Sequence, residues 1–117
     1  MPKSIGIKKY NIAVFISGTG SNLRNLINHS LKKHSKFRIS LVISDKSKAK
    51  GLEYAYRFKI KKKIINFLDI KKSEKKILNE LTNNKIDLVC LAGFMKILSG
   101  NFIKRFKGKI INIHPSL

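Results

Sequence analysis

Two short stretches of the chain carry residue types that could do chemistry, and the first is the glycine turn SGTGSN. It stands between an apolar run and an amphipathic run, so it joins a predicted strand to a predicted helix. Glycine adopts positive φ and lets a ligand approach the main chain, which here concerns Gly18 and Gly20. The N–H groups at the start of the helix carry partial positive charge, and Ser21 and Asn22 can cap it or add side-chain donors. The turn is therefore a candidate phosphate site, and the alternative is a tight turn that binds nothing.

The second stretch is INIHPSL at the end of the sequence, in which Asn112 and His114 lie two positions apart. On a strand, residues with this spacing point to the same face. An amide can donate a hydrogen bond to a developing oxyanion, and an imidazole can carry a proton or stabilise that oxyanion near neutral pH. The pair therefore indicates acyl transfer, although a polar strand end before a turn would look the same. No protein nucleophile accompanies the pair, so the nucleophile of such a reaction would belong to a substrate.

Apolar runs alternate with amphipathic runs along the chain, and this order decides where the two stretches lie. We expect strands at Tyr10–Ser17, Phe37–Ser44, Lys62–Phe67, Ile86–Ala92 and Lys109–Ile113, and helices at Asn22–His34, 48–58, 71–83 and Ser99–Phe106, the last capped by Ser99. The predicted fold class is α/β, a Rossmann-like open parallel sheet with helices on both faces. Ligands of such sheets bind beyond the carboxyl ends of the strands. Both stretches fall at that edge, so one cleft can serve both.

Composition limits the remaining functions. The 117 residues fit one small domain, and no apolar run reaches the roughly 18 residues of a membrane helix, so we expect a cytoplasmic protein without a membrane partner. Cys90 is the only cysteine and lies in an apolar run, which predicts a reduced, buried thiol. We interpret His29 and His34 as surface histidines and expect no metal site. Twenty-six Lys and Arg against six Asp and Glu give a net charge of +20, spread over nearly every predicted element, which indicates mainly a solvated surface.

Four segments, read in order, resemble one enzyme family. They are VFISGTGSNLRNLI, VISDKSKAKGLEYA, DLVCLAGFMKILS and IINIHPSL. Together they are similar to the N-terminal part of the phosphoribosylglycinamide formyltransferases, the folate-dependent enzymes of purine biosynthesis. The resemblance covers the chain from about Asn11 to Leu117. Methionyl-tRNA formyltransferase shares a similar Asn-x-His-Pro segment but lacks this Ser-Gly-x-Gly-Ser-Asn-Leu opening.

The resemblance implies a reaction and a role for each matching residue. The family moves a formyl group from its co-substrate 10-formyltetrahydrofolate to the amine of glycinamide ribonucleotide. By resemblance, the ribonucleotide phosphate would be held by Gly20, Ser21 and Asn22. The folate would be bound by Met95, Lys96, Ile97, Leu98 and Asn112. Asn112 would also bond the formyl oxygen, and His114 would donate a proton and stabilise the tetrahedral intermediate.

The chain departs from the family pattern in two respects. The family usually has Arg where this chain has Lys96, and lysine lacks the fork-shaped donor set of arginine. Family members also continue further, and that continuation carries a folate-binding loop and an aspartate partner for the histidine. We therefore expect residues 1–9 to be a loose leader and 10–117 to be a truncated formyltransferase domain. Such a fragment would keep the ribonucleotide half-site and have weak or no activity.

Two other functions stay open at this point. Formyltetrahydrofolate deformylase is related, and in its reaction water takes the place of the amine. A non-catalytic nucleotide- or nucleic-acid-binding module would use the lysine runs Lys61–Lys63, Lys71–Lys72 and Lys75–Lys76 to track phosphates. We expect no nucleic-acid partner, because aromatic residues do not interleave with these lysines to stack on bases. The sequence leaves open whether the chain forms a homodimer.

Overall fold

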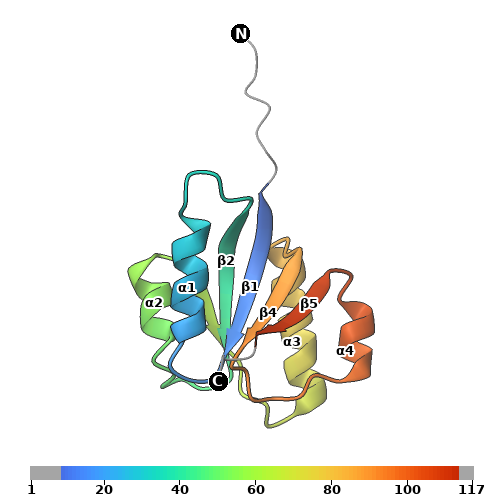
Figure 1. The fold of residues 1–117 in the computed structure, drawn as a ribbon. Coiled ribbons are helices and arrows are strands. Elements are labelled where there is room, and N and C mark those ends of the chain that lie inside the picture. Colours follow the sequence, from blue (N-terminus) through green and yellow to red (C-terminus); the bar gives the residue numbers. More distant parts are fainter. Residues whose placement is uncertain (1–8, 114–117) are drawn as a thin grey trace.

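The computed structural model describes residues 9–113, in which strands and helices alternate (Figure 1). The strands are β1 (Tyr10–Ile16), β2 (Phe37–Ser44), β3 (Lys61–Ile64), β4 (Leu88–Ala92) and β5 (Lys109–Ile113). The helices are α1 (Ser21–Ser30), α2 (Leu52–Arg57), α3 (Ile70–Asn83) and α4 (Gly100–Arg105). The predicted alternation is confirmed. Within the described residues, every helix is too short or too polar to span a bilayer.

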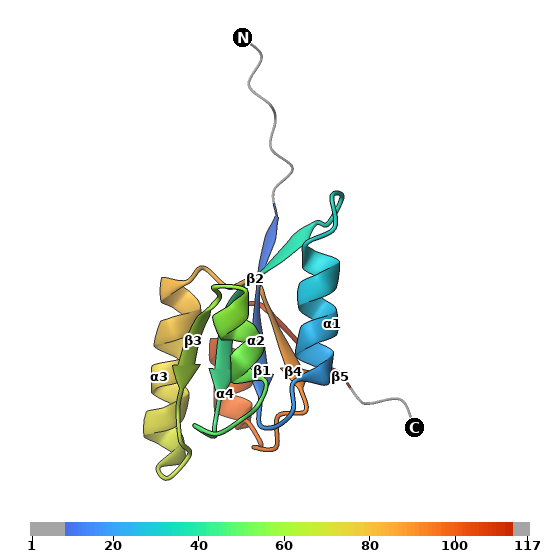
Figure 2. The ribbon, with the colours of Figure 1, turned by 90° about the vertical axis from the view of Figure 1, so that its left-hand side faces the viewer.

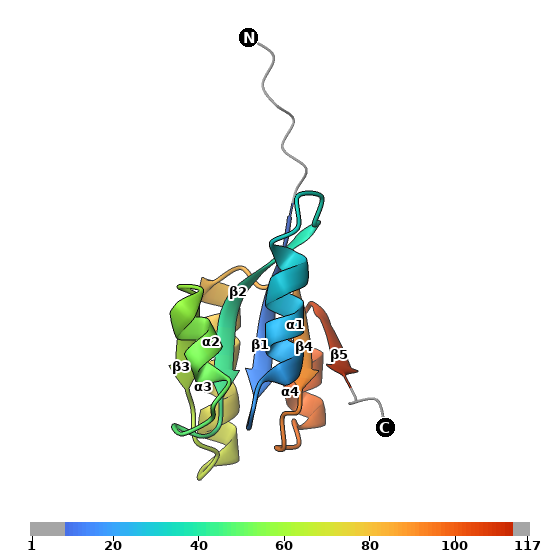
Figure 3. The same cartoon turned by 60° about the vertical axis from the view of Figure 1, so that its left-hand side comes forward.

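The strands form one parallel sheet in the order β3-β2-β1-β4-β5. Helices α1 and α2 cover one face, and α3 and α4 cover the other (Figures 2 and 3). This is the predicted Rossmann-like arrangement. Because the strands all run in one direction, the segments that leave them meet at one edge, which lies at the bottom of Figure 1. We call this edge the carboxyl edge.

Alternation along the strands sends apolar side chains to two separate clusters. The cluster under α1 and α2 includes Ile12, Val14, Ile16, Leu23 and Ile27. The cluster under α3 and α4 includes Ala13, Phe15, Ile77, Leu81 and Phe102. Burial of one large apolar side chain contributes about 1.5–3 kcal/mol, so the two clusters together fix the helices on both faces. The packed sheet therefore fixes the points at which the loops of the carboxyl edge begin and end.

Several elements are shorter than the sequence predicts. Helix α2 covers Leu52–Arg57 rather than 48–58, and β4 covers Leu88–Ala92 rather than Ile86–Ala92. Helix α1 ends at Ser30 rather than His34, and the Ser30 hydroxyl donates to the carbonyl of Ile27 at 2.7 Å. The next apolar residue, Leu31, is 65% exposed, so no core contact extends the helix.

Strand β3 covers Lys61–Ile64 rather than Lys62–Phe67. The N–H of Ile65 still bonds the carbonyl of Ser44 at 2.9 Å, after which the chain leaves the sheet. Asn66 then turns it toward α3, because its side chain accepts the N–H of Leu68 at 3.2 Å. Local side-chain bonds of this kind compete with the sheet and end the strand early.

Cys90 lies on β4 and packs in the cluster under α1 and α2, where it is 1% exposed. Burial raises the pKa of its thiol, because apolar surroundings disfavour the charged thiolate. The prediction of a buried cysteine is confirmed.

We expect Cys90 to react with Ellman's reagent no faster than the protein unfolds, because the thiolate is the nucleophile and burial suppresses it. Since the folded-state pKa is raised, the thiol's contribution to stability is present below its unfolded-state pKa and is lost as the pH rises beyond it. Absorbance traces in native buffer and in denaturant compare the two rates. Rapid labelling of the native protein would contradict the burial.

Candidate functional site

The glycine turn connects β1 to α1 and touches the main chain just before α2. Gly20 is the N-cap residue of α1 and has a φ of 76°, in the left-handed region. A Cβ at Gly20 would lie 2.5 Å from the Cα of Gly51, and the N–H of Gly51 donates to the carbonyl of Gly18 at 3.0 Å. The expectation of positive φ at Gly18 is wrong, because a single left-handed residue completes the turn. Glycine is therefore required at position 20, because the main chains at Gly20 and Gly51 approach too closely to admit a side chain.

The first turn of α1 presents main-chain N–H groups at the carboxyl edge. The helix has ten residues, and the N–H groups of a first turn lack acceptors within the helix. Within the described residues no side chain caps this end, so the capping that Ser21 or Asn22 could provide is not made. The first turn contains no acidic residue, so nothing there offsets the positive end of the helix dipole. This end of α1 is suited to an anion.

The segment that follows β4 begins on an aromatic anchor and then becomes exposed. The ring of Phe94 meets the rings of Phe15 and Phe67 edge-on, with centroids 5.4 and 5.6 Å apart. Beyond it lie the four consecutive predicted folate-lining residues, Met95, Lys96, Ile97 and Leu98, which form neither helix nor strand. The side chains of Met95 and Ile97 are 73% and 89% exposed. Apolar side chains and main chain outside any helix or strand are thus both accessible here.

Asn112 lies on β5 and is exposed. In the sheet register, Leu91 of β4 is the partner of both Asn112 and Phe15. Neighbouring partners in a parallel sheet point to the same face, and Phe15 and Leu91 pack under α3 and α4. Asn112 therefore points to the face on which the segment 95–98 runs from β4 to α4. Its predicted partner, His114, lies outside the described residues.

The carboxyl edge brings three of the predicted groups together: the glycine turn, the segment 95–98 and Asn112. Only β4 separates β1 from β5, so the ends of these two strands are about 10 Å apart at normal strand spacing. One molecule of nucleotide size can span that distance. The surface positions expected of His29 and His34 are confirmed. Over residues 9–113, no group of three or more His, Cys, Asp or Glu side chains gathers as metal ligands would.

Three buried polar residues at this edge are absent from the predicted set. The Ser17 hydroxyl donates to Oδ1 of Asp45 at 2.6 Å and accepts the N–H of Met95 at 2.9 Å. Glu74 of α3 accepts both the N–H and the hydroxyl of Ser99, at 2.7 and 2.6 Å. Ser17 and Asp45 carry a sequence signal, since each is a polar residue just after an apolar strand. Glu74 carries none, because its partner lies 25 positions away in another element.

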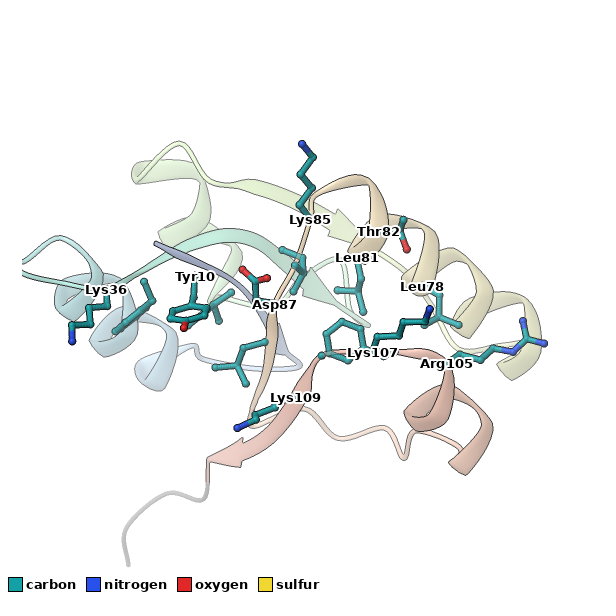
Figure 4. Close-up of a pocket in the computed structure, with 16 residues that line it drawn as sticks. Tyr10, Lys36, Leu78, Leu81, Thr82, Lys85, Asp87, Arg105, Lys107 and Lys109 are labelled. Carbon is teal, nitrogen blue, oxygen red and sulfur yellow. The ribbon is translucent and has the colours of Figure 1, made fainter. Parts of the chain in front are cut away.

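A hollow of about 1020 Å³ lies at the opposite edge of the sheet and contains none of the predicted site residues (Figure 4). Its lining includes apolar side chains such as Leu81 and Phe106 and several cations. In Figure 4 the charged ends of Lys36, Lys85 and Arg105 point away from one another, so they do not converge on a common anion. We therefore place the candidate site at the carboxyl edge, where groups of complementary chemistry lie together.

Comparison with known proteins shows which family the chain belongs to. A profile of the formyl transferase family matches residues 10–117. The chain belongs to the formyl transferase family. Among curated formyl transferase relatives, the phosphoribosylglycinamide formyltransferase of Haemophilus influenzae is 41% identical over 109 residues, covering 91% of this chain and 51% of that protein. The human trifunctional purine biosynthetic protein adenosine-3 is 44% identical over 116 residues, covering 94% of this chain and 11% of that protein.

Solved formyl transferase structures share the fold. The phosphoribosylglycinamide formyltransferase of Brucella melitensis superposes with a TM-score of 0.88 at 40% identity, covering 94% of this chain and 59% of that one. The enzyme from Anaplasma phagocytophilum gives 0.83 at 42% identity, covering 94% and 52%. The predicted formyltransferase fold is thereby confirmed. The chain spans about half the length of the bacterial relatives that it matches.

We expect Gly20→Ala to lower the free energy of unfolding by about 1–3 kcal/mol, the usual cost of a strained left-handed residue, because its Cβ would also meet the Gly51 main chain. Gly18→Ala is the matched control: a Cβ there meets nothing within 4 Å. Denaturant titrations of both variants provide the measurement. Equal stability of the two variants would contradict the close contact of Gly20 with Gly51.

Proposed function

We propose that this chain forms the ribonucleotide-binding half of a phosphoribosylglycinamide formyltransferase. In this reaction a formyl group passes from 10-formyltetrahydrofolate to the amine of glycinamide ribonucleotide. The observation that carries the proposal is the similarity to the Brucella enzyme over 94% of the chain, with a TM-score of 0.88. The names of the curated relatives, a separate bacterial formyltransferase and a trifunctional purine biosynthetic protein, support the same assignment.

The phosphate of glycinamide ribonucleotide would bind the main-chain N–H groups of Gly20, Ser21 and Asn22. Support comes from the uncapped start of α1 and from the lack of an acidic residue in its first turn. Ser21 is exposed and Asn22 is half-buried, so their side chains can add donors. The net charge of +20 would also raise the local concentration of an anionic substrate.

The folate would bind against the segment 95–98 and Asn112. A flat, partly apolar ring system needs an accessible apolar surface and nearby main-chain donors and acceptors. The exposed side chains of Met95 and Ile97 and the irregular main chain between them meet that need. The departure at Lys96 is compatible with main-chain recognition, because Lys96 is exposed and the proposed contacts come mostly from its neighbours' backbone.

The chemistry would need no protein nucleophile. The amine of the ribonucleotide attacks the formyl carbon, and the side-chain N–H of Asn112 donates to the formyl oxygen as negative charge develops there. His114 would carry the proton between the attacking amine and the departing nitrogen. Cys90 cannot take part as a nucleophile, because its thiol is buried in the cluster under α1 and α2.

We expect glycinamide ribonucleotide to shift the backbone amide signals of Gly20, Ser21 and Asn22 in a nuclear magnetic resonance titration. Because the chain is strongly basic, sulfate at equal ionic strength serves as the control for non-specific anion binding. Saturable shifts with the ribonucleotide that sulfate does not reproduce would support the site. If these three signals stay in place at millimolar ligand, the phosphate-site assignment is wrong.

We expect Asn112→Ala to slow formyl transfer about 100-fold or more, the usual cost of removing one oxyanion donor, while leaving ribonucleotide binding unchanged. Asn101→Ala, on the exposed surface of α4, is the matched control. A radiolabelled formyl donor makes slow turnover measurable. Formate release without formylated ribonucleotide would instead indicate a deformylase, and equal rates for the two variants would exclude the role given to Asn112.

A further inference from the structure

The two ends of the exposed segment 95–98 are held by the same arrangement of groups. At each end, a buried carboxyl group accepts a serine hydroxyl, and that hydroxyl accepts a main-chain N–H. At the start the groups are Asp45, Ser17 and the N–H of Met95. At the end they are Glu74, Ser99 and the N–H of Phe102. The carboxyl groups come from parts of the chain far from the segment, so both bonds are tertiary contacts.

At the start of the segment, Asp45 fixes the direction of the Ser17 hydroxyl. A serine hydroxyl has one proton to donate and lone pairs to accept with. Its proton is committed to Oδ1 of Asp45 at 2.6 Å, so a lone pair is left for the N–H of Met95 at 2.9 Å. Ser17 and Asp45 are 5% and 7% exposed, so water does not compete readily for these bonds. The first residue of the segment is therefore tied to the ends of both β1 and β2.

At the end of the segment, Glu74 holds Ser99 by two bonds. One carboxyl oxygen accepts the N–H of Ser99 at 2.7 Å, and the other accepts its hydroxyl at 2.6 Å. The same hydroxyl accepts the N–H of Phe102 at 3.1 Å and so caps α4, which confirms the predicted N-cap. Glu74 is 6% exposed. It therefore fixes both where the segment stops and where α4 begins.

Between these two anchors the other support for the segment is Leu98, which is half-buried and packs against the cluster under α3 and α4. Met95 and Ile97 are 73% and 89% exposed, and the segment forms neither helix nor strand. A segment without such support samples many conformations, and fixing each residue costs about 1–2 kcal/mol of conformational entropy. A loop already held in its bound form does not have to lose that freedom when a ligand arrives. The anchors therefore matter most for a function that needs the main chain in one fixed shape.

We propose that Asp45, through Ser17, and Glu74, through Ser99, are positioning residues that hold the main chain of the segment 95–98 ready to bind the folate co-substrate. The inference rests on the proposed function and adds to it, because none of these four residues touches a reactant in the assignment above.

Asp45 also shows that the first anchor is not optimised for stability alone. Within the described part of the chain, its Oδ2 atom is buried and has no hydrogen-bond partner. A buried polar atom without a partner costs free energy, and such atoms are uncommon in folded proteins. The carboxyl group is used here for the single bond that orients Ser17, which is the bond the segment depends on.

We expect Ser99→Ala and Ser17→Ala to weaken binding of 5-formyltetrahydrofolate, a stable folate probe, about tenfold each, the effect of losing one or two hydrogen bonds. Binding of glycinamide ribonucleotide should not change. Ser99→Thr keeps the hydroxyl and should restore folate affinity. Glu53→Gln removes an exposed carboxylate from α2 and is the control for altered charge. Calorimetric titration measures both ligands for every variant.

Amide hydrogen exchange separates a positioning effect from general loss of stability. In the two alanine variants, we expect exchange at residues 95–99 to speed up about tenfold or more. Exchange at Val14 in the core should change only by the amount that the separately measured change in unfolding free energy predicts. Ser99→Thr should exchange as the wild type does.

The outcomes distinguish the two levels of the assignment. Folate binding by the wild type with equal affinity in both alanine variants would overturn the positioning role and leave the proposed function standing. A wild type that binds the ribonucleotide but shows no folate binding would overturn both the folate assignment and the positioning role. Exchange at residues 95–99 that speeds up no more than exchange at Val14 would show a purely structural role and would also overturn the proposal.

Discussion

The hydroxyl of Ser17 is the interaction on which the carboxyl edge depends. It lies at the end of the central strand, donates to Asp45 beyond β2 and accepts the N–H of Met95 beyond β4. One buried group thus sets the relative positions of three strand ends. In an open parallel sheet these ends form the ligand site, so loss of this hydroxyl would release the segment that follows β4. The two helical layers fix the sheet, and Ser17 relates the loops to it.

The other side of β1 depends on a steric constraint rather than on a hydrogen bond. The main chains at Gly20 and Gly51 approach closely. A Cβ on Gly20 would lie 2.5 Å from the Cα of Gly51, and a Cβ on Gly51 would lie 3.0 Å from the Cα of Gly20. This contact seats the start of α1 against the start of α2 and leaves its first N–H groups facing the edge. Glycine at this turn therefore serves two purposes: it allows the close packing against Gly51, and it leaves the N–H groups at the start of α1 accessible. A requirement for close packing alone would account for glycine at position 20 without any ligand, which is why the ligand assignment needs its own test.

Much of the fold could be predicted from the sequence because apolar periodicity has a local cause. The strand predicted at Tyr10–Ser17, which the structure has at Tyr10–Ile16, and the cap at Ser99 are confirmed. Burial on two faces and a helix start each leave a pattern within a few residues. The placement of Gly20 and Asn112 at the carboxyl edge was predictable because each motif sits at a strand end, while their binding roles stay predictions. The conformation of Gly18, which lacks the expected positive φ, and the role of Glu74 depend on contacts with distant segments, and no local pattern encodes those. The shortened β3 has a local origin instead, because the side chain of Asn66 accepts the N–H of Leu68, two positions along the chain, and this bond competes with the sheet.

The distribution of the acidic residues explains how so basic a chain keeps an ordered site. Five of its six carboxyl groups accept a hydrogen bond or an ion pair, and they are Asp45, Asp69, Glu74, Glu80 and Asp87. Most of the few acidic side chains therefore make a contact within the fold, while the lysines of the described residues occupy exposed positions. A surface charge of +20 attracts any anion at low salt and is screened at distances beyond about 8 Å at physiological ionic strength. Charge alone cannot select one anion from another, so selection must come from local geometry. The contact with Gly51 maintains that geometry at Gly20, and two buried carboxyl groups maintain it along the segment 95–98.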